Sequence, residues 1–294
     1  MRILAVALAA AVTFVAVPVP AQDPQPIKFV DVHMHMMVEN ITPDEEIALM
    51  KKVGVSRAVF MHNEPDKLEE IARKYPDFVI PSLSFTRPTP NSVTLNENSG
   101  AEIEKLYKEH RICAIGEIGG GNFGADSAPL RSIYAAAQNT GVPIIFHIDL
   151  AQPETVAAVE SVLTAYPKMK FVLAHLGWTA APDLIGRLLD AHSNLYTDVS
   201  IRLDAPGSLP WRNRGLDLSV LQTSETFPPA WRAVIDRHRD RFLFATDINS
   251  FGPRYTIAAD LMATARKALA PLPRETQDLI AHGNVERLLG SCAK

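Results

Sequence analysis

The sequence predicts a single (β/α)8 barrel, the TIM-barrel class, behind an N-terminal leader. Short apolar or β-branched runs alternate with segments of helical periodicity, which is the pattern of parallel strand–helix units. Eight such runs can be counted, and eight units make a barrel the economical closure. Polar side chains fall toward the C-terminal ends of these runs, where barrels of this class build their active sites.

The N-terminus has the pattern of a secretory signal peptide. The apolar run Ile3–Val17 is followed by small residues and prolines, and polar residues begin at Gln22. The run is shorter than the ~20 residues that a membrane span needs and lacks a basic flank after it, which disfavours a membrane anchor. We therefore predict a signal peptide at residues 1–21 and a mature barrel at residues 22–294. The protein is expected in a bacterial periplasm or secreted, with no stable membrane insertion after cleavage.

Most of the expected strands are apolar at nearly every position, as when both faces of a parallel sheet are buried. An open, doubly wound sheet is the structural alternative, because eight strands alone do not prove closure. The expected strands are Phe29–His35, Val55–His62, Phe78–Phe85, Ile112–Gly119, Val142–Asp149, Lys170–Gly177, Asn194–Ile201 and Arg241–Asn249.

Helical segments separate these strands, and most begin at a proline, whose fixed φ and missing N–H suit the first helical turn. No linker-like or low-complexity break divides the chain, which indicates one domain. The expected helices include Pro43–Val53, Pro65–Tyr75, Ala101–His110, Pro129–Thr140, Pro153–Tyr166, Pro182–His192 and Pro229–Arg239.

Composition and charge agree with one large folded unit. The chain has 294 residues, of which 47% are hydrophobic, and this is ample for a large core. A net charge of −4 provides no sequence-wide basic field to attract nucleic acid or anionic lipid. The expected partner is a small-molecule substrate, and a homo-oligomer stays open.

Cysteine usage predicts no disulfide framework, although the expected compartment is oxidising. Only Cys113 and Cys292 are present, and they lie far apart in the sequence. We expect Cys113 to be a small core residue at the start of a strand and Cys292 to be a tail thiol.

The first expected strand contains a histidine pair that can bind a metal. His33 and His35 are two residues apart, so their side chains project from the same face of the strand. Alone, the pair could equally be two satisfied polar residues. Buried strands avoid unpaired polar groups, yet other strands also end in potential ligands, namely Glu117, His147, His175 and Asp247. Mixed imidazole and carboxylate ligation suits one or two divalent ions, zinc first, with manganese, iron or cobalt as alternatives.

The order of these residues resembles the amidohydrolase superfamily, which has HxH on strand one, Glu on strand four, His on strands five and six, and Asp on strand eight. The segment Gly283–Leu289, GNVERLL, is similar to the G-N-x-x-R-L-[FL] signature that ends many members of the amidohydrolase-2 branch. The match spans the chain from Phe29 to this segment. The resemblance implies a metal-dependent hydrolase.

The resemblance also implies a role for each of the six residues. One metal would be bound by His33, His35 and Asp247, and a second by His147 and His175, with Glu117 as the bridge. Related one-metal members use HxH, the strand-five histidine and the strand-eight aspartate, which leaves the strand-six histidine, here His175, for catalysis. The number of metals is therefore open.

One departure from the family pattern bears on substrate class. The GEIGGG segment resembles the GEIGLD motif of the deoxyribonuclease branch, but Ala245 stands where that branch usually has glutamate. Because the chain is also acidic overall, we do not expect nuclease activity.

The implied reaction is hydrolysis of an amide, ester or lactone by a metal-activated water. Asp247 is the expected general base, because a carboxylate that touches both the metal and the attacking water can orient the nucleophile and shuttle its proton. Two other readings remain open. One is a non-oxidative decarboxylase of a small carboxylic acid with one metal and a catalytic His175, and the other is an exported metal- or solute-binding protein without turnover.

Arginine and tryptophan side chains follow the later strands on the expected substrate side. Together they favour an anionic, partly apolar substrate, because arginine can bind a carboxylate through two hydrogen bonds. Candidates for substrate contact are Trp178, Arg202 and Arg254, with Trp211, Arg212 and Arg214 as further members of the group. His62 is a further candidate for the site from the second strand, but we expect it to be a satisfied residue at the edge of the core.

Overall fold

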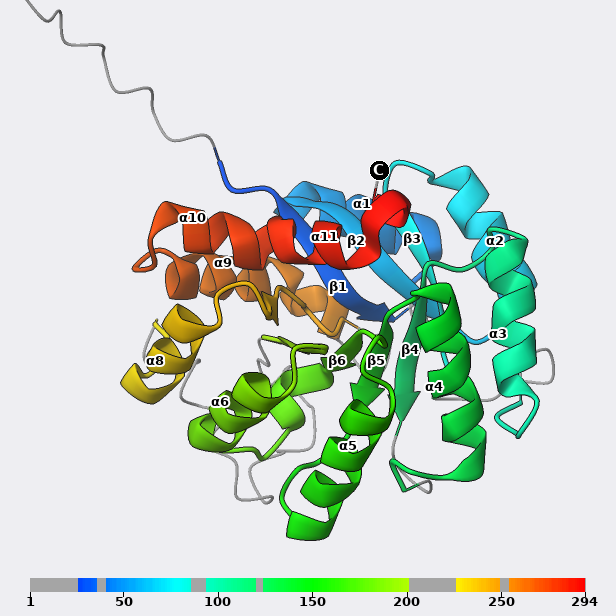
Figure 1. Cartoon of the computed structure of the whole chain (residues 1–294). Coiled ribbons are helices and arrows are strands. Elements are labelled where there is room, and N and C mark those ends of the chain that lie inside the picture. The colour runs from blue at the N-terminus through cyan, green and yellow to red at the C-terminus, as the bar shows by residue number, and fades with distance from the viewer. Residues whose placement is uncertain are drawn as a thin grey trace, which may run out of the picture.

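The computed structural model describes residues 26–35, 41–85, 94–119, 124–200, 226–248 and 254–293. Within these residues, eight parallel strands lie in sequence order around the molecule and alternate with helices (Figure 1). The strands are β1 Phe29–His35, β2 Val55–His62, β3 Val79–Leu83, β4 Ala114–Gly119, β5 Ile144–His147, β6 Phe171–Leu173, β7 Leu195–Asp198 and β8 Phe242–Leu243.

Backbone hydrogen bonds between β1 and the segment after β8 close the barrel. Val32 N–H donates to the carbonyl of Phe244 at 3.0 Å, and His35 N–H donates to the carbonyl of Ile248 at 2.8 Å. Asp247 N–H in turn donates to the carbonyl of His33 at 2.9 Å. The predicted barrel is confirmed, and the open-sheet alternative is wrong.

Helices cover the outside of the strands (Figure 1). None of the helices in the described ranges is long and apolar enough to cross a bilayer. They are α1 Pro43–Val53, α2 Pro65–Lys74, α3 Ser99–Lys108, α4 Ala128–Thr140, α5 Pro153–Ala165, α6 Pro182–Ala191, α8 Pro229–Arg237, α9 Ala258–Leu269, α10 Arg274–Asp278 and α11 Asn284–Leu289.

Several strands are shorter than the sequence pattern predicts. The run expected to form one strand at Lys170–Gly177 forms β6 and then a 3-10 turn, η1, at Ala174–Gly177. The run expected at Arg241–Asn249 pairs as a strand over β8, and beyond β8 the described residues form one isolated bridge, between Ile248 and Met34. Apolar character marks burial, and burial continues beyond the last ladder hydrogen bond at the mouth of the barrel. The excess length therefore belongs to the segments that carry the site.

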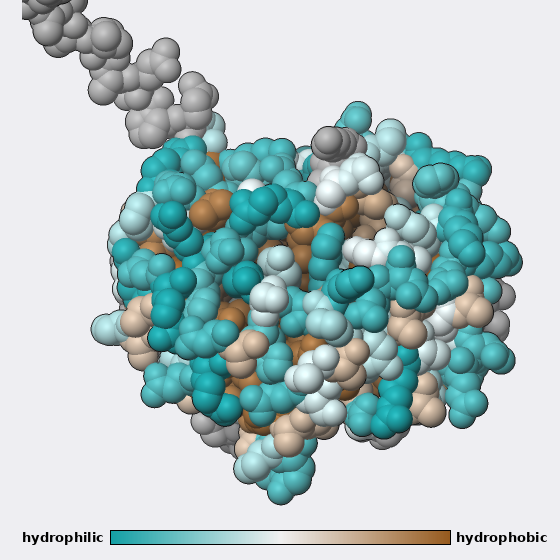
Figure 2. Space-filling model, viewed as in Figure 1, coloured by the Kyte–Doolittle hydropathy of each residue, from teal (hydrophilic) through white to brown (hydrophobic). Residues whose placement is uncertain are grey.

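The hydrophobic core has two parts. The larger part lies between the strands and the surrounding helices. The smaller part fills the barrel, since it draws on alternate positions of successive strands. Its members are Val30, Val32, Val59, Met61, Ile80, Ala114, Ile145, Val172, Ala174, Leu243 and Ala245, completed by Val285, Leu288 and Leu289 of α11. The N-terminal end of the barrel is thus closed by α11, whereas the C-terminal end carries the polar cluster described below. The face turned toward the viewer in Figure 1 is mainly hydrophilic, with apolar residues visible between the polar ones (Figure 2).

A disulfide joins Cys113, directly before β4, to Cys292 in the terminal turn η5, Gly290–Ala293. The expectation of no disulfide and of a free thiol at Cys292 is therefore wrong. The two residues are 179 positions apart in the sequence, but their Cα atoms are 5.8 Å apart, a usual separation for a disulfide. The large distance in sequence suggested no contact, but α11 returns the chain to the N-terminal end of the barrel and so brings Cys292 next to Cys113. Cys113 does pack against the interior core, as expected.

Candidate metal centre

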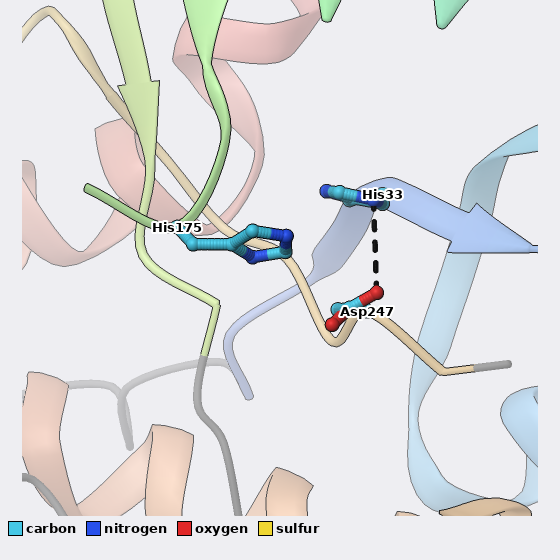
Figure 3. A group of neighbouring side chains, drawn as sticks. All are labelled: His33, His175 and Asp247. Atoms are coloured by element: carbon cyan, nitrogen blue, oxygen red, sulfur yellow. Dashed lines mark ion pairs between the residues drawn. The ribbon is translucent and has the colours of Figure 1, made fainter. Parts of the chain in front are cut away.

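All six residues predicted as metal ligands meet at the C-terminal mouth of the barrel. Their potential ligand atoms form three triads, and within each triad the atoms lie within 4.8 Å of one another. Each of His33, Glu117 and His175 belongs to two of the three triads. Figure 3 shows one triad, in which His33, His175 and Asp247 approach one another from β1, from η1 and from the segment after β8. The triads are His33–His35–Glu117, Glu117–His147–His175 and His33–His175–Asp247.

The histidine pair of β1 points two ring nitrogens at the same place. The Nε2 atoms of His33 and His35 are 3.0 Å apart, and Asp247 Oδ1 lies 3.7 Å from the first and 3.5 Å from the second. At most one hydrogen fits between two nitrogens at that distance, so at least one of them faces the other with its lone pair. Two imidazoles and a carboxylate in this arrangement suit a divalent cation such as zinc.

Glu117 lies between the two histidine pairs. Its Oε1 is 2.7 Å from His147 Nδ1 and 3.3 Å from His175 Nε2, while its Oε2 is 3.3 Å from His35 Nε2. Burial would raise the pKa of Glu117, but the charge of His33 and the hydrogen bonds from the other histidines lower it well below its usual value. The carboxylate therefore stays ionised, with one oxygen toward each side of the cluster.

The electrostatics of His33 mirror those of Glu117. Burial disfavours a charge on this ring, but Glu117, Asp198 and Asp247 outweigh burial and raise the pKa of His33 well above its usual value. The site thus gathers carboxylates around a fully buried imidazole and is built to hold positive charge.

Two of the six residues sit in the left-handed backbone region. His175 has φ 55° and Asp247 has φ 50°, a conformation that costs a non-glycine residue about 1–3 kcal/mol. Each lies where its strand ladder has ended, and the unusual φ turns the side chain across the barrel mouth. Such strain persists where the surroundings enforce it, and it clusters at functional sites.

Strand β4 is braced so that Glu117 is held in place. The hydroxyls of Ser82 and Ser84, on and just after β3, donate to the carbonyls of Gly116 and Glu117 at 2.9 and 3.1 Å. Gly116 has φ 142°, and a Cβ built there would lie 2.5 Å from the carbonyl oxygen of Ile145 on β5. Only glycine lets β4 and β5 approach this closely beside the site.

Sequence reasoning missed two buried aspartates that support the cluster. Asp31 accepts hydrogen bonds from the His33 N–H at 2.9 Å and from Thr246 N–H at 3.1 Å, and so joins β1 to the segment that carries Asp247. Burial raises the pKa of Asp31 to about 7. Asp198, the last residue of β7, contacts His33 and the turn at His175. Both are polar residues in strands that are expected to be buried. Since buried strands avoid unpaired polar groups, the reasoning that selected Glu117 also applies to these two aspartates.

The residues expected to contact substrate divide into three groups. Trp178 is buried beside the cluster, with its ring centroid 4.7 Å from that of His147 and 5.6 Å from that of His175. Arg254 begins the turn η3, Arg254–Ile257, but its side chain lies outside the described part of the chain. Also outside the described residues are Arg202, Trp211, Arg212 and Arg214.

His62 is satisfied by its own loop, as the sequence predicts. Its Nδ1 accepts the backbone N–H of Glu64 at 2.9 Å. Burial lowers the pKa of His62, so the neutral ring is the favoured form. On β2 it follows Met61, which faces the barrel interior, and it therefore points outward.

Comparison with known proteins identifies the family. Residues 29–291 match the amidohydrolase family, and the chain belongs to that family. The predicted resemblance is thereby confirmed. Membership agrees with a metal-dependent hydrolase and equally with the decarboxylase that the sequence left open. No curated protein sequence matches the chain.

Solved structures share the barrel at low sequence identity. A 5-carboxyvanillate decarboxylase from Sphingomonas paucimobilis is 13% identical, with a TM-score of 0.63 over 90% of this chain and 99% of that one. A probable 2-pyrone-4,6-dicarboxylic acid hydrolase from Acinetobacter baumannii, with citric acid bound, is 13% identical, with a TM-score of 0.60 over 89% and 99%. A dihydroxybenzoic acid decarboxylase from Polaromonas, with bound manganese and an inhibitor, is 14% identical, with a TM-score of 0.57 over 90% and 96%. At these identities the likeness establishes the fold alone.

Proposed function

We propose that this protein is a metal-dependent hydrolase that cleaves an amide, ester or lactone bond in a small carboxylated molecule. The observation that carries the proposal is the position of Glu117, whose two oxygens face different histidines. A carboxylate shared by two ligand triads is the arrangement that a two-metal hydrolytic site needs. One-metal chemistry does not require it.

The donor set fits zinc, with manganese, iron or cobalt as alternatives, because it combines imidazole nitrogens with carboxylate oxygens. One ion would be held by His33, His35 and Asp247, and a second by His147 and His175, with Glu117 common to both. Bound divalent metal would supply the Lewis acidity that activates a water and polarises the bond to be cleaved.

The protein's own groups would carry the proton. Asp247 is nearly buried and lies 3.5–3.7 Å from the paired histidine nitrogens, where a carboxylate can take a proton from the attacking water and deliver it to the leaving group. His175 is the second candidate for proton transfer. The apolar ring of Trp178 covers His147 and His175 and would exclude bulk water from that side.

A carboxylated substrate is supported by the proteins that share this fold. Two of them, a 5-carboxyvanillate decarboxylase and a probable 2-pyrone-4,6-dicarboxylic acid hydrolase, are named after carboxylated ring compounds. The name of the first protein also supports a second candidate function, the non-oxidative decarboxylation of a small carboxylic acid. For that reaction, one metal and His175 would be sufficient.

The experiment is an activity panel combined with metal analysis. The purified chain is incubated with lactones, esters, amides and carboxylated aromatics, with and without a chelator, and metal content is measured in wild type and Glu117→Gln. We expect chelator-sensitive hydrolysis, two ions per chain in the wild type, and preferential loss of one ion in the variant. One ion in both proteins, with release of CO2 from a carboxylated aromatic, would establish the decarboxylase instead. Stable metal binding with no turnover across the panel would favour the binding protein.

We also propose that the protein is exported after cleavage of residues 1–21 and works in the periplasm or medium. The leader pattern and the Cys113–Cys292 disulfide both support this, because disulfides persist in oxidising compartments. The intact mass of the exported protein should correspond to a start near Gln22. A full-length chain retained in the membrane fraction would contradict cleavage.

A further inference from the structure

Asp198 contacts two residues of the candidate metal centre, His33 and His175. It is the last residue of β7 and is fully buried. Its Oδ2 lies 3.0 Å from His33 Nδ1. Its Oδ1 accepts the backbone N–H groups of His175 at 2.9 Å and of Ser200 at 3.1 Å, and also the hydroxyl of Ser200. One carboxylate thus receives four donors, two of them from residues at or beside the site.

The contact with His33 fixes which ring nitrogen of that histidine carries a hydrogen. An ionised carboxylate has only acceptor oxygens, so the hydrogen between Asp198 Oδ2 and His33 must sit on Nδ1. In the neutral ring, Nε2 then presents its lone pair. That atom is the one 3.0 Å from His35 Nε2, inside the candidate metal centre. Carboxylate–histidine pairs of this kind orient metal ligands and raise their basicity.

The contact through Ser200 imposes the same form on His175. The Ser200 hydroxyl has one hydrogen, which it donates to Asp198. Its oxygen can therefore only accept from His175 Nδ1, which lies 3.0 Å away. His175 accordingly carries its hydrogen on Nδ1, and its Nε2 faces Glu117 Oε1 at 3.3 Å.

We propose that Asp198 is a positioning residue that sets the tautomers of two histidines in the site, His33 directly and His175 through Ser200. The two rings stack with centroids 4.9 Å apart, so the same carboxylate fixes the direction in which both present Nε2. The proposal rests on the proposed metal-dependent function, because its consequence is a change in metal affinity. The tautomers themselves can be measured in the protein without metal.

Asparagine is the informative replacement because it keeps the shape of the side chain but has only one acceptor oxygen. If that oxygen faces His33, the amide hydrogens face the N–H groups of His175 and Ser200. If the amide is reversed, its hydrogens face His33 Nδ1–H. Either orientation releases one of the two rings from its fixed form.

The experiment measures tautomers and zinc affinity in the same set of variants. Nitrogen-15 spectra of histidine-labelled, metal-free protein, recorded at a pH high enough for both rings to be neutral, report which ring nitrogen is protonated. Competition with a chromophoric chelator gives the zinc dissociation constant. The variants are Asp198→Asn, Ser200→Ala and Ser200→Thr. Thr197→Val is the matched control, because it removes a buried hydrogen bond from the same strand, donated to the carbonyl of Leu173, outside this network.

Wild type is expected to show Nδ1–H at both histidines. Asp198→Asn should mix the tautomers and weaken zinc binding about 10–100-fold. Ser200→Ala should release only His175, Ser200→Thr should retain its Nδ1–H form, and Thr197→Val should change neither measurement.

The outcomes separate this proposal from the proposed function. Wild-type spectra and zinc affinity retained in Asp198→Asn, or an equal loss in Thr197→Val, would overturn the positioning role alone. Ser200→Ala with His175 unchanged would overturn the path through Ser200. A wild-type chain that shows the expected tautomers yet binds no zinc, manganese, iron or cobalt would contradict the proposed function and leave the tautomer assignment standing.

Discussion

Asp247 and Glu46 are both nearly buried carboxylates, at 4% and 1% exposure, but their surroundings differ. Asp247 lies within 4 Å of two histidines, so its charge is matched. Glu46, on α1, has an oxygen with no hydrogen-bond partner among the described residues. Burial, and then the nearby charge of Asp31, raises the pKa of Glu46 well above its usual value. A buried charge is tolerated when it is paired, whereas an unpaired buried charge lowers stability.

The first prediction concerns Asp247. Asp247→Asn should lower kcat about 10²–10⁴-fold with a much smaller change in KM, because an amide cannot take the proton that a carboxylate accepts. Steady-state kinetics on the best substrate of the panel is the measurement, and metal content is determined on the same preparation. Near-normal turnover at full metal occupancy, across pH, would rule out Asp247 as the base.

The second prediction concerns Glu46. A carboxyl whose pKa is higher in the folded state binds more protons there, so stability falls as pH rises from the unfolded pKa toward the folded one. Glu46→Gln removes this penalty and should stabilise the protein at pH 7.5 by roughly 1–3 kcal/mol, with the gain disappearing near pH 4. Urea unfolding at both pH values measures it. Glu154→Gln, an exposed first-turn position of α5, is the control and should change little at either pH. A Glu46→Gln gain that does not depend on pH would show that Glu46 is not protonated on folding.

At the residue scale, the sequence predicts the candidate ligands that cluster in the structure better than the residues that support them. Spacing on one strand and polar residues at the ends of apolar runs select His33, His35 and the other four candidates, and the structure brings all six together. Asp198 and Ser200 follow the same pattern in the expected strand Asn194–Ile201. Their role depends on which atom faces which, and a one-dimensional pattern does not contain that information.

Strand β4 shows how one element can depend on a single small residue. A methyl group at Gly116 would press on the Ile145 carbonyl, and the φ of 142° is unfavourable for any side chain. The third prediction is that Gly116→Ala lowers the free energy of unfolding by roughly 1–3 kcal/mol and weakens metal binding, because Glu117 shifts with the strand. Urea unfolding and chelator competition are the measurements. Gly124→Ala is the control, because nothing lies within 4 Å of a Cβ built there. Equal effects of the two substitutions would contradict the role of close strand approach.

The C-terminal signature is structural in this chain. Asn284, the first residue of α11, donates from its side chain to the carbonyls of Arg239 and Phe242 at 2.8 and 2.7 Å, and Arg287 donates back to Asn284 at 2.6 Å. The motif therefore fastens α11 to the start of β8. This explains how a family signature can lie at the end of the barrel opposite the candidate site.

At the scale of the whole molecule, the sequence predicted the eight strands and the helices α1–α6 and α8 in their order, but neither the helices α9–α11 after β8 nor the contacts between distant elements. Periodicity is local, so the strands and helices were accessible, and their number implied closure. The predicted strands at β6 and β8 were too long, because the chain stays buried there after the hydrogen bonds between strands have ended. The disulfide was missed since it depends on the position of α11 after the barrel has closed.

The last prediction concerns that disulfide, which links the start of β4 to the end of the chain across 179 residues of sequence. A cross-link that closes so long a loop restricts the unfolded chain strongly, and losing it should cost roughly 2–5 kcal/mol. Both reduction of the wild type and the double substitution Cys113→Ala with Cys292→Ala should lower the urea midpoint, and by similar amounts. Activity under native conditions should persist, because the disulfide lies at the N-terminal end of the barrel and the candidate site at the other. Unchanged urea midpoints would show that α11 holds its place without the link. Loss of activity with an unchanged midpoint would show instead that the two ends of the barrel are coupled.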